Sequence, residues 1–169
     1  VERGYPLALA CWQVGTPQLR NRGTIAGNLI TASPANDTIA ALWALDARLI
    51  LRSVDGEREG SYPDFYEGVR ETVLASNEMV TDISFKAMEP HQRGVFAKLA
   101  LRRVHAISVV NAAAVLSFDE DIIAEARITM GSVAPTVIRA REAESALVGR
   151  RLTEESLDMA ADLASRATS

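Results

Sequence analysis

The sequence is poor in the residues that build metal centres, disulfides and nucleophilic sites. Its 169 residues include one cysteine and two histidines. The single cysteine, Cys11, has no partner for an internal disulfide, and no Cys or His set has the spacing of a structural zinc site. No serine lies in a G-x-S-x-G elbow, which argues against nucleophilic catalysis. A secreted disulfide scaffold and a zinc-stabilised domain are therefore excluded.

The ten glycines are spread thinly, and no two are adjacent or two residues apart. The G-x-G dinucleotide fingerprint is therefore absent, and Gly23 does not open a phosphate loop because the fifth residue after it is Asn28. The apolar runs are far shorter than the roughly 20 residues that span a membrane. The formal net charge of −4 argues against nucleic acid as a partner.

What remains is the composition of one or two small globular domains, with 48% hydrophobic and 24% charged residues. Asn36 and Asp37 precede an apolar run, which predicts a helix with an N-cap. Asp55-Gly56 predicts a hairpin-type turn. The other elements expected in the first half are a helix over 6–14, a polar glycine-bearing loop over 15–34, a strand over 47–54, a turn into a short helix or loop over 62–68, and a strand over 78–86.

The second half reads as strands followed by helices, which indicates an α+β fold. We expect three strands over 95–103, 106–118 and 122–131, forming an antiparallel meander with an acidic turn between the last two. The alanine triplet within the second strand also suits a helix, but its β-branched neighbours favour a strand. A helix opened by Pro135 and ended by Gly149 should follow, and then a helix from the N-cap Thr153 to about Ala167. Pro90 and Gly94 bracket a boundary loop, which gives domains 1–90 and 91–169.

The most informative segment is 21–37, NRGTIAGNLITASPAND. Gly23 and Gly27 bracket small or apolar residues, so this loop can bring backbone N–H groups against an anion with little side-chain bulk in the way. Thr24 and Asn28 can add side-chain hydrogen bonds. Asp37 can accept a hydrogen bond from a sugar hydroxyl, or it can cap the helix that follows it. The alternative is a structural turn followed by a capped helix.

The longer string VGTPQLRNRGTIAGNLITASPAND resembles a known flavin-contacting loop. It is the second such loop of the FAD-binding subunit or domain of the xanthine dehydrogenase and carbon monoxide dehydrogenase (molybdenum hydroxylase) family, which reads like IRN-x-x-TIGGN-x-x-x-ASP-x-x-D. The matching positions are Arg20, Asn21, Thr24, Ile25, Gly27, Asn28, Ala32, Ser33, Pro34 and Asp37. The later segments FAKLALRR, AISVVNAAAVL and MGSVAPTVIRAREAESALVGRRLTEE extend the resemblance over nearly the whole chain.

The resemblance implies the second subdomain of a PCMH-type FAD-binding domain. A small domain like the CO dehydrogenase flavoprotein C-terminal domain would follow, with a three-stranded antiparallel sheet and helices. In the family a first FAD subdomain with an AGGT-like glycine pair lies upstream, so we expect Val1 to be a cut edge of a fragment or a truncated member. Ser169 would precede the closing strand or tail. Ala26 departs from the family, which usually has glycine there.

The resemblance also assigns cofactor contacts. Asp37 would hydrogen-bond on the ribityl or ribose side of FAD. Lys98, one of two lysines among 18 basic residues, would lie near the isoalloxazine ring, where a cation stabilises reduced, anionic flavin. The alternative for Lys98 is a solvated lysine at a strand end. The residues expected against the pyrophosphate are Thr24, Ile25, Ala26, Gly27 and Asn28, and those expected as apolar flavin contacts are Val14 and Val80.

These assignments imply the flavoprotein component of a cytoplasmic oxidoreductase, in which FAD passes electrons from iron–sulfur clusters to an acceptor. One cysteine cannot ligate a cluster that needs about four thiolates, so the clusters and the molybdenum cofactor are expected in partner subunits. Two alternatives stay open. One is an interaction or scaffold domain that keeps the fold without binding FAD, and the other is an unrelated phosphate-binding module that uses the Gly23–Asn28 turn.

Overall fold

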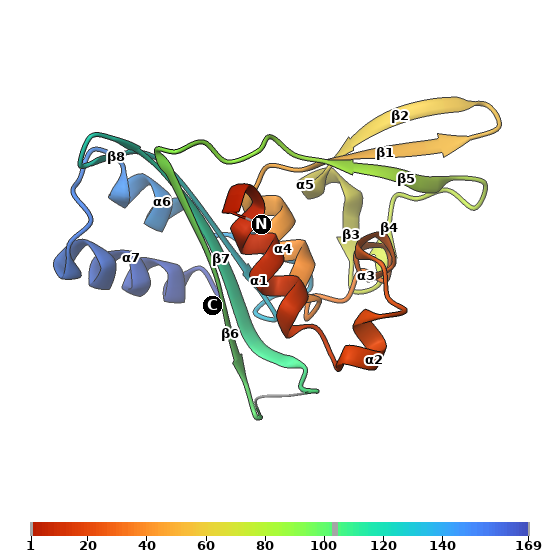
Figure 1. Ribbon diagram of the computed structural model, residues 1–169, viewed down its shortest axis with the longest axis horizontal. Helices are drawn as coiled ribbons and strands as arrows, with labels where there is room; N and C mark the ends of the chain where they lie inside the picture. Colours follow the sequence, from red (N-terminus) through yellow and green to blue (C-terminus); the bar gives the residue numbers. More distant parts are fainter. Residues whose placement is uncertain (1, 103–104, 169) are drawn as a thin grey trace.

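The computed structural model describes residues 2–102 and 105–168, and it confirms the α+β class. Figure 1 shows a long sheet flanked by helices, with a hairpin extending away from it. The elements of the first half are η1 (Glu2–Gly4), α1 (Tyr5–Gln13), α2 (Pro17–Arg20), α3 (Ile25–Ile30), α4 (Asp37–Ala44), β1 (Arg48–Ser53), β2 (Gly56–Ser61), α5 (Tyr62–Phe65), β3 (Tyr66–Gly68), β4 (Glu71–Thr72) and β5 (Met79–Ser84). Those of the second half are β6 (Gln92–Ala100), β7 (Ser108–Asp119), β8 (Ile122–Gly131), β9 (Ile138–Arg139), α6 (Arg141–Leu147) and α7 (Glu154–Arg166).

The helices at 6–14 and after Asn36, the turn at Asp55-Gly56 and the strands near 47–54 and 78–86 are confirmed. The polar loop expected over 15–34 is wrong, because it contains the short helices α2 and α3. Each begins at a threonine cap. The Thr16 hydroxyl accepts a hydrogen bond from Leu19 N at 3.4 Å, and the Thr24 hydroxyl accepts one from Gly27 N at 2.9 Å. Such caps stabilise helix starts that apolar periodicity alone does not reveal.

The C-terminal sheet has the order β6-β7-β8-β9, with every neighbouring pair antiparallel. The expected meander is confirmed, except that Arg103, the predicted end of its first strand, lies outside the described residues. The loop between Pro90 and Gly94 is wrong, because Gly94 lies inside β6 and pairs with Val115. A Cβ at Gly94 would meet Pro6 Cγ at 2.5 Å, so this glycine serves close packing of α1 on the strand.

The helix expected from Pro135 is also wrong in its start. Residues 138–139 form β9, in which Ile138 pairs with Met130, and α6 begins only at Arg141. The β-branched pair Val137-Ile138 suits this extended edge strand better than a helix. The predicted end at Gly149 is confirmed by its φ of +80°, and Thr153 caps α7 by accepting from Ser156 N.

The long sheet separates two apolar cores. α1 and α4 lie against one face, where Ile39 and Leu42 of α4 pack with Phe96 and Ala113 of the sheet. α6 and α7 cover the other face (Figure 1), where Leu147 joins a second core. The N-terminus of α4 is thereby held directly over the middle strands. Within the described residues, no helix combines the length and apolarity needed to cross a membrane.

Candidate functional site

The centre of the site is a buried carboxylate. Asp37, the first residue of α4, is 4% exposed. Its Oδ2 accepts a hydrogen bond from Lys98 Nζ at 2.6 Å, and its Oδ1 accepts one from Ser108 Oγ at 2.5 Å. The Asn111 amide also donates to Oδ1, at 3.4 Å. A charge this deep is stable only when it is paired and hydrogen-bonded, and these three donors meet that requirement.

The sheet register brings these donors together. Lys98 on β6 pairs directly with Asn111 on β7, and Asn111 pairs in turn with Gly131 on β8. The three residues form one rung across the sheet, and Asp37 lies over it. Because Gly131 has no side chain, the rung leaves room for the Asn111 amide and for the Pro34 carbonyl, which accepts from Ser132 N at 2.9 Å.

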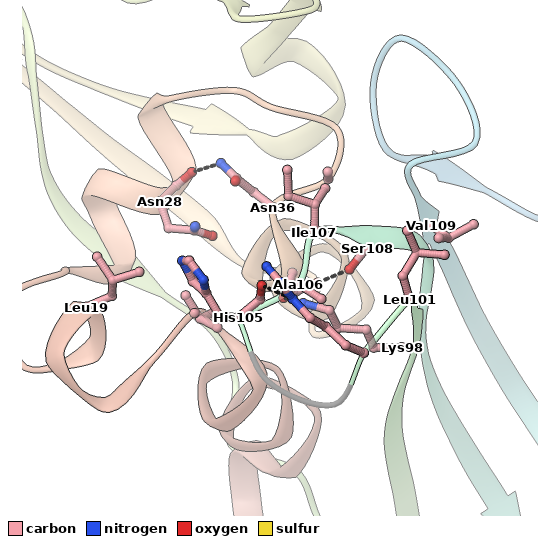
Figure 2. Close-up of a pocket in the computed structure, with 15 residues that line it drawn as sticks. Leu19, Asn28, Asn36, Lys98, Leu101, His105, Ala106, Ile107, Ser108 and Val109 are labelled. Carbon is pink, nitrogen blue, oxygen red and sulfur yellow. Dashed lines mark hydrogen bonds and ion pairs between the residues drawn. The ribbon is translucent and has the colours of Figure 1, made fainter.

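A cavity of about 750 Å³ adjoins this carboxylate. Its volume lies within the range of roughly 300–1,000 Å³ that is typical of small-molecule sites. Figure 2 shows side chains from the N-terminal helices and from β6 and β7 gathered around it. The residues that line it are Val14, Gly15, Leu19, Asn28, Ala35, Asn36, Asp37, Lys98, Leu101, Arg102, His105, Ala106, Ile107, Ser108 and Val109.

A second cavity, of about 600 Å³, adjoins the first and shares Val14, Leu19 and Asn28 with it. It lies over the start of α3, and Arg20 and Arg22 contribute positive charge to its wall. The other residues that line it are Cys11, Gly23, Thr24, Ile25, Gly27, Thr31 and Thr38. The two neighbouring cavities, together called the hollow below, have a cationic wall on the side of the second cavity and the Asp37–Lys98 pair on the side of the first.

The predicted anion loop is the first turn of α3. The first backbone N–H groups of a helix have no intrahelical partner, so those of Ile25 and Ala26 are available to a ligand. Ala26 lies in the helix, where φ is negative, so its methyl group brings no backbone strain in place of glycine. The N-terminus of α3 is therefore a usable, although short, set of donors.

Asn28 connects the two cavities. Its Oδ1 accepts from Thr38 Oγ1 at 2.5 Å, and its backbone oxygen accepts from Thr31 Oγ1 at 2.8 Å and from the Asn36 amide. Within the part of the chain that the structure describes, its Nδ2 has no hydrogen-bond partner. The side chain is thus fixed at its Oδ1 end, and its Nδ2 donor is free to bind a ligand.

The structure brings most of the predicted residues together. Val14 and Asn28 line both cavities, Asp37 and Lys98 line the first, and Thr24, Ile25 and Gly27 line the second. Ala26 lines neither of these two cavities. Val80 is not brought to them either: it pairs with Leu51 on β1, and its half-buried side chain packs against the first core.

The alternative of a solvated strand-end lysine is wrong for Lys98, whose side chain is 7% exposed. Asp37 does not act as a helix cap, because the N-cap position is Asn36 and the Asp37 carboxylate binds Lys98, Ser108 and Asn111 instead.

The sequence did not predict Ser108 and Asn111 as residues of the site. The available signal was the three polar residues, Ser108, Asn111 and Ser117, inside the otherwise apolar strand predicted over 106–118. Burial raises the pKa of the Cys11 thiol, so this residue of the second cavity stays protonated at neutral pH. No group of three His, Cys, Asp or Glu residues in 2–102 or 105–168 is arranged to hold a metal ion.

Two family models match the chain. The model of the FAD binding domain in molybdopterin dehydrogenase matches residues 2–85, and that of the CO dehydrogenase flavoprotein C-terminal domain matches residues 96–169. The chain is 36% identical over 153 residues to a nicotinate dehydrogenase FAD-subunit from Eubacterium barkeri, covering 88% of this chain and 52% of that protein. It is 32% identical to a carbon monoxide dehydrogenase medium chain from Hydrogenophaga pseudoflava, covering 94% and 55%.

Solved structures agree with these matches. A carbon monoxide dehydrogenase structure from Hydrogenophaga pseudoflava superposes with a TM-score of 0.86 at 33% identity, covering 92% of this chain and 54% of that one. Quinoline 2-oxidoreductase from Pseudomonas putida 86 gives 0.81 at 30% identity, covering 90% and 52%. The chain thus spans about half the length of these relatives.

Proposed function

Because the chain belongs to the family of FAD-binding subunits and domains of the carbon monoxide dehydrogenase and xanthine dehydrogenase type, we propose that it binds FAD in the hollow made of its two neighbouring cavities. The observation that carries this proposal is the pairing of a cationic, helix-start end with a buried carboxylate–lysine end in one hollow. A dinucleotide needs both kinds of surface, because its pyrophosphate is anionic and its flavin carries polar ring edges.

The residues present fit this cofactor. The Ile25 N–H group, with Arg20 and Arg22 nearby, suits the pyrophosphate, whereas Ala26 lines neither cavity and is left out. The free Asn28 amide suits an oxygen of the linker between ring and phosphates. The apolar side chains of the first cavity suit the flavin ring. Thr24 and Gly27 complete the wall at the anion end, while Val80, which lines neither cavity, is left out of the proposed contact set.

Lys98 supplies the electrostatic part of the proposal. Its ammonium donates to Asp37 Oδ2 at 2.6 Å and to the Gln13 carbonyl oxygen at 3.5 Å, and an ammonium has three N–H donors. A fixed buried cation favours negative charge that develops beside it, so Lys98 would favour the reduced cofactor. FAD, when bound, supplies the capacity to take up and release electrons, and the chain positions it and sets its potential.

We further propose that the protein works as the medium subunit of a multi-subunit oxidoreductase. Its partners would be an iron–sulfur subunit and a subunit with a molybdenum cofactor, and FAD would pass their electrons to an acceptor. The relatives named as CO dehydrogenase medium chain and nicotinate dehydrogenase FAD-subunit support this role. The domain division at residues 90 and 91 and the cytoplasmic location stay predictions.

A flavin titration tests the proposal. The purified chain is mixed with FAD, and binding is followed by quenching of flavin fluorescence and by calorimetry. We expect saturable binding of one FAD per chain. A chain that neither quenches flavin fluorescence nor shows a heat of binding at high FAD concentration would overturn the proposal and favour the scaffold alternative.

Variants then locate the site. Asn28→Ala should weaken FAD binding by about 1–3 kcal/mol, as expected for one lost buried hydrogen bond. Asn77→Ala is the matched control, because this exposed asparagine hydrogen-bonds Asp55 in the first half, outside both cavities. Equal affinities of the two variants would place the cofactor elsewhere.

A further inference from the structure

Ser108 and Asn111 reach the same oxygen of Asp37 although they are three residues apart on one strand. In a regular strand, residues at odd spacing point to opposite faces. Here β7 carries an extra residue: Ser108 pairs with Ala100 and Val110 pairs with Leu99, so Val109 is left without a partner on β6. This β-bulge turns Ser108 to the same face as Asn111, and Val109 is exposed as a result. Bulges of this kind often re-aim a side chain beside a functional site.

The Asn111 amide is oriented by the carboxylate. Its Nδ2 donates to Asp37 Oδ1, while within the described residues its buried Oδ1 has no partner. The opposite orientation would place two acceptors, Asn111 Oδ1 and the Asp37 carboxylate, against each other. Leaving Asn111 Oδ1 buried without a partner costs free energy. The same orientation lets Asn111 Nδ2 act as a second donor to Asp37 Oδ1.

We propose that Ser108 and Asn111 are positioning residues, which fix the Asp37 carboxylate so that it holds the Lys98 ammonium at the cavity wall. Both donors occupy Oδ1 and leave Oδ2 to Lys98 alone, so the carboxyl group cannot rotate without losing hydrogen bonds. The effect on a flavin rests on the proposed function, whereas the effect on Lys98 does not. Asn111 lines neither cavity and would act without touching the cofactor, whereas Ser108 also lines the first cavity.

The lysine content of the chain allows a direct test. Its two lysines are Lys98, with a side chain 7% exposed, and Lys86, with a side chain 84% exposed. Trace acetylation of the folded chain, read for each lysine by mass spectrometry, reports how freely each amine reacts. Lys98 should react more slowly than Lys86 in the wild type. Lys86 is then the internal standard in every variant.

Ser108→Ala should raise the Lys98 acetylation rate by about tenfold, the change that corresponds to one lost charge-assisted hydrogen bond. Ser108→Thr, which keeps the hydroxyl, should restore the slow rate. The matched control is Ser117→Ala, which removes another buried β7 hydroxyl, one that accepts from Gln92 Nε2 at 2.9 Å. It should leave Lys98 slow, although its loss of stability should be similar.

Asn111→Ala is the second test variant, and it should also raise the acetylation rate of Lys98. Circular dichroism shows that each variant is folded, which separates this effect from global unfolding. An unchanged Lys98 rate in both Ser108→Ala and Asn111→Ala, or an equal increase in Ser117→Ala, would overturn the inference. Because no FAD is present, this result stands apart from the flavin titration: failure to bind FAD would overturn the proposed function alone. If FAD binds, Asn111→Ala, which changes a residue outside both cavities, should shift its visible spectrum and Ser117→Ala should not.

Discussion

Gly131 on β8 lies so close to Asn111 on β7 that a Cβ on the glycine would be 2.6 Å from Asn111 Oδ1. The same Cβ would meet the Pro34 carbonyl oxygen at 2.9 Å. Real side chains almost never approach this closely, so an alanine here would displace either the amide or the backbone just before α4. Because Gly131 has no Cβ, the segment just before Asp37 can lie close to the sheet.

Gly131→Ala should therefore destabilise the fold by about 1–3 kcal/mol, as is typical of overpacking at a site with no free space. Chemical denaturation measures the free energy of unfolding. Gly60→Ala is the control, because a Cβ there would only meet Leu51 Cδ1 at an ordinary 3.7 Å. Similar stabilities of the two variants would mean that the rung relaxes without cost.

The Asp37–Lys98 pair should show the asymmetry of buried ion pairs. Asp37→Asn leaves the Lys98 ammonium buried without a counter-charge, and we expect a loss of about 3–5 kcal/mol in the free energy of unfolding. The double variant Asp37→Asn with Lys98→Met removes both charges and should recover most of this loss. A double-mutant cycle of denaturation curves measures the coupling. Additive losses from Asp37→Asn and Lys98→Met would contradict the pairing.

Lys98 should also set the potential of bound FAD. Lys98→Met removes a fixed cation from the cavity wall, so the reduced, anionic cofactor loses stabilisation and the reduction potential should fall. A fall of roughly 30 mV corresponds to about 1.4 kcal/mol for a two-electron couple. Lys98→Arg keeps the charge and serves as the control. Potentiometric titration of both variants decides, and an unchanged potential in Lys98→Met would assign the lysine to stability alone.

The sequence predicted correctly those elements that depend on residues close together in the chain. The cap at Thr153, the helix after Asn36 and the strand over 122–131 follow from residue types within a few positions, and all are present. The dense motif from Arg20 to Asp37 likewise predicted residues that the fold places around one hollow. Short-range patterns and motif spacing are the properties that a single sequence carries well.

The relationships that a sequence does not carry are those set by register. Lys98 meets Asp37 across 61 positions, and Ser108 meets it across 71. The bulge at Val109 depends on how β6 and β7 are paired, which no local pattern encodes. The late start of α6 has a similar cause, because pairing of β9 with β8 outweighs the helix propensity of the segment after Pro135. Tertiary context determined each of these features.

Far from the hollow, Glu78 should contribute to acid sensitivity. Its Oε1 accepts from Arg58 Nε at 2.7 Å, and its Oε2 accepts from Arg58 and from Ala75 N at 2.8 and 2.9 Å. These bonds, from Arg58 first and then from the Ala75 backbone, lower the pKa of Glu78 from 4.5 to about 2. The folded state therefore binds this proton less readily than the unfolded state.

The stabilisation from Glu78 is fully present above pH 4.5 and is lost as the pH falls from 4.5 towards 2. The wild-type melting temperature should thus decline in this window, and Glu78→Gln should show a shallower decline from a lower starting value. Glu59→Gln, an exposed change on the same strand as Arg58, is the control and should keep the wild-type slope. Melting curves at a series of pH values give the answer. Identical slopes for Glu78→Gln and the wild type would show that the Arg58–Glu78 pair does not contribute to acid unfolding.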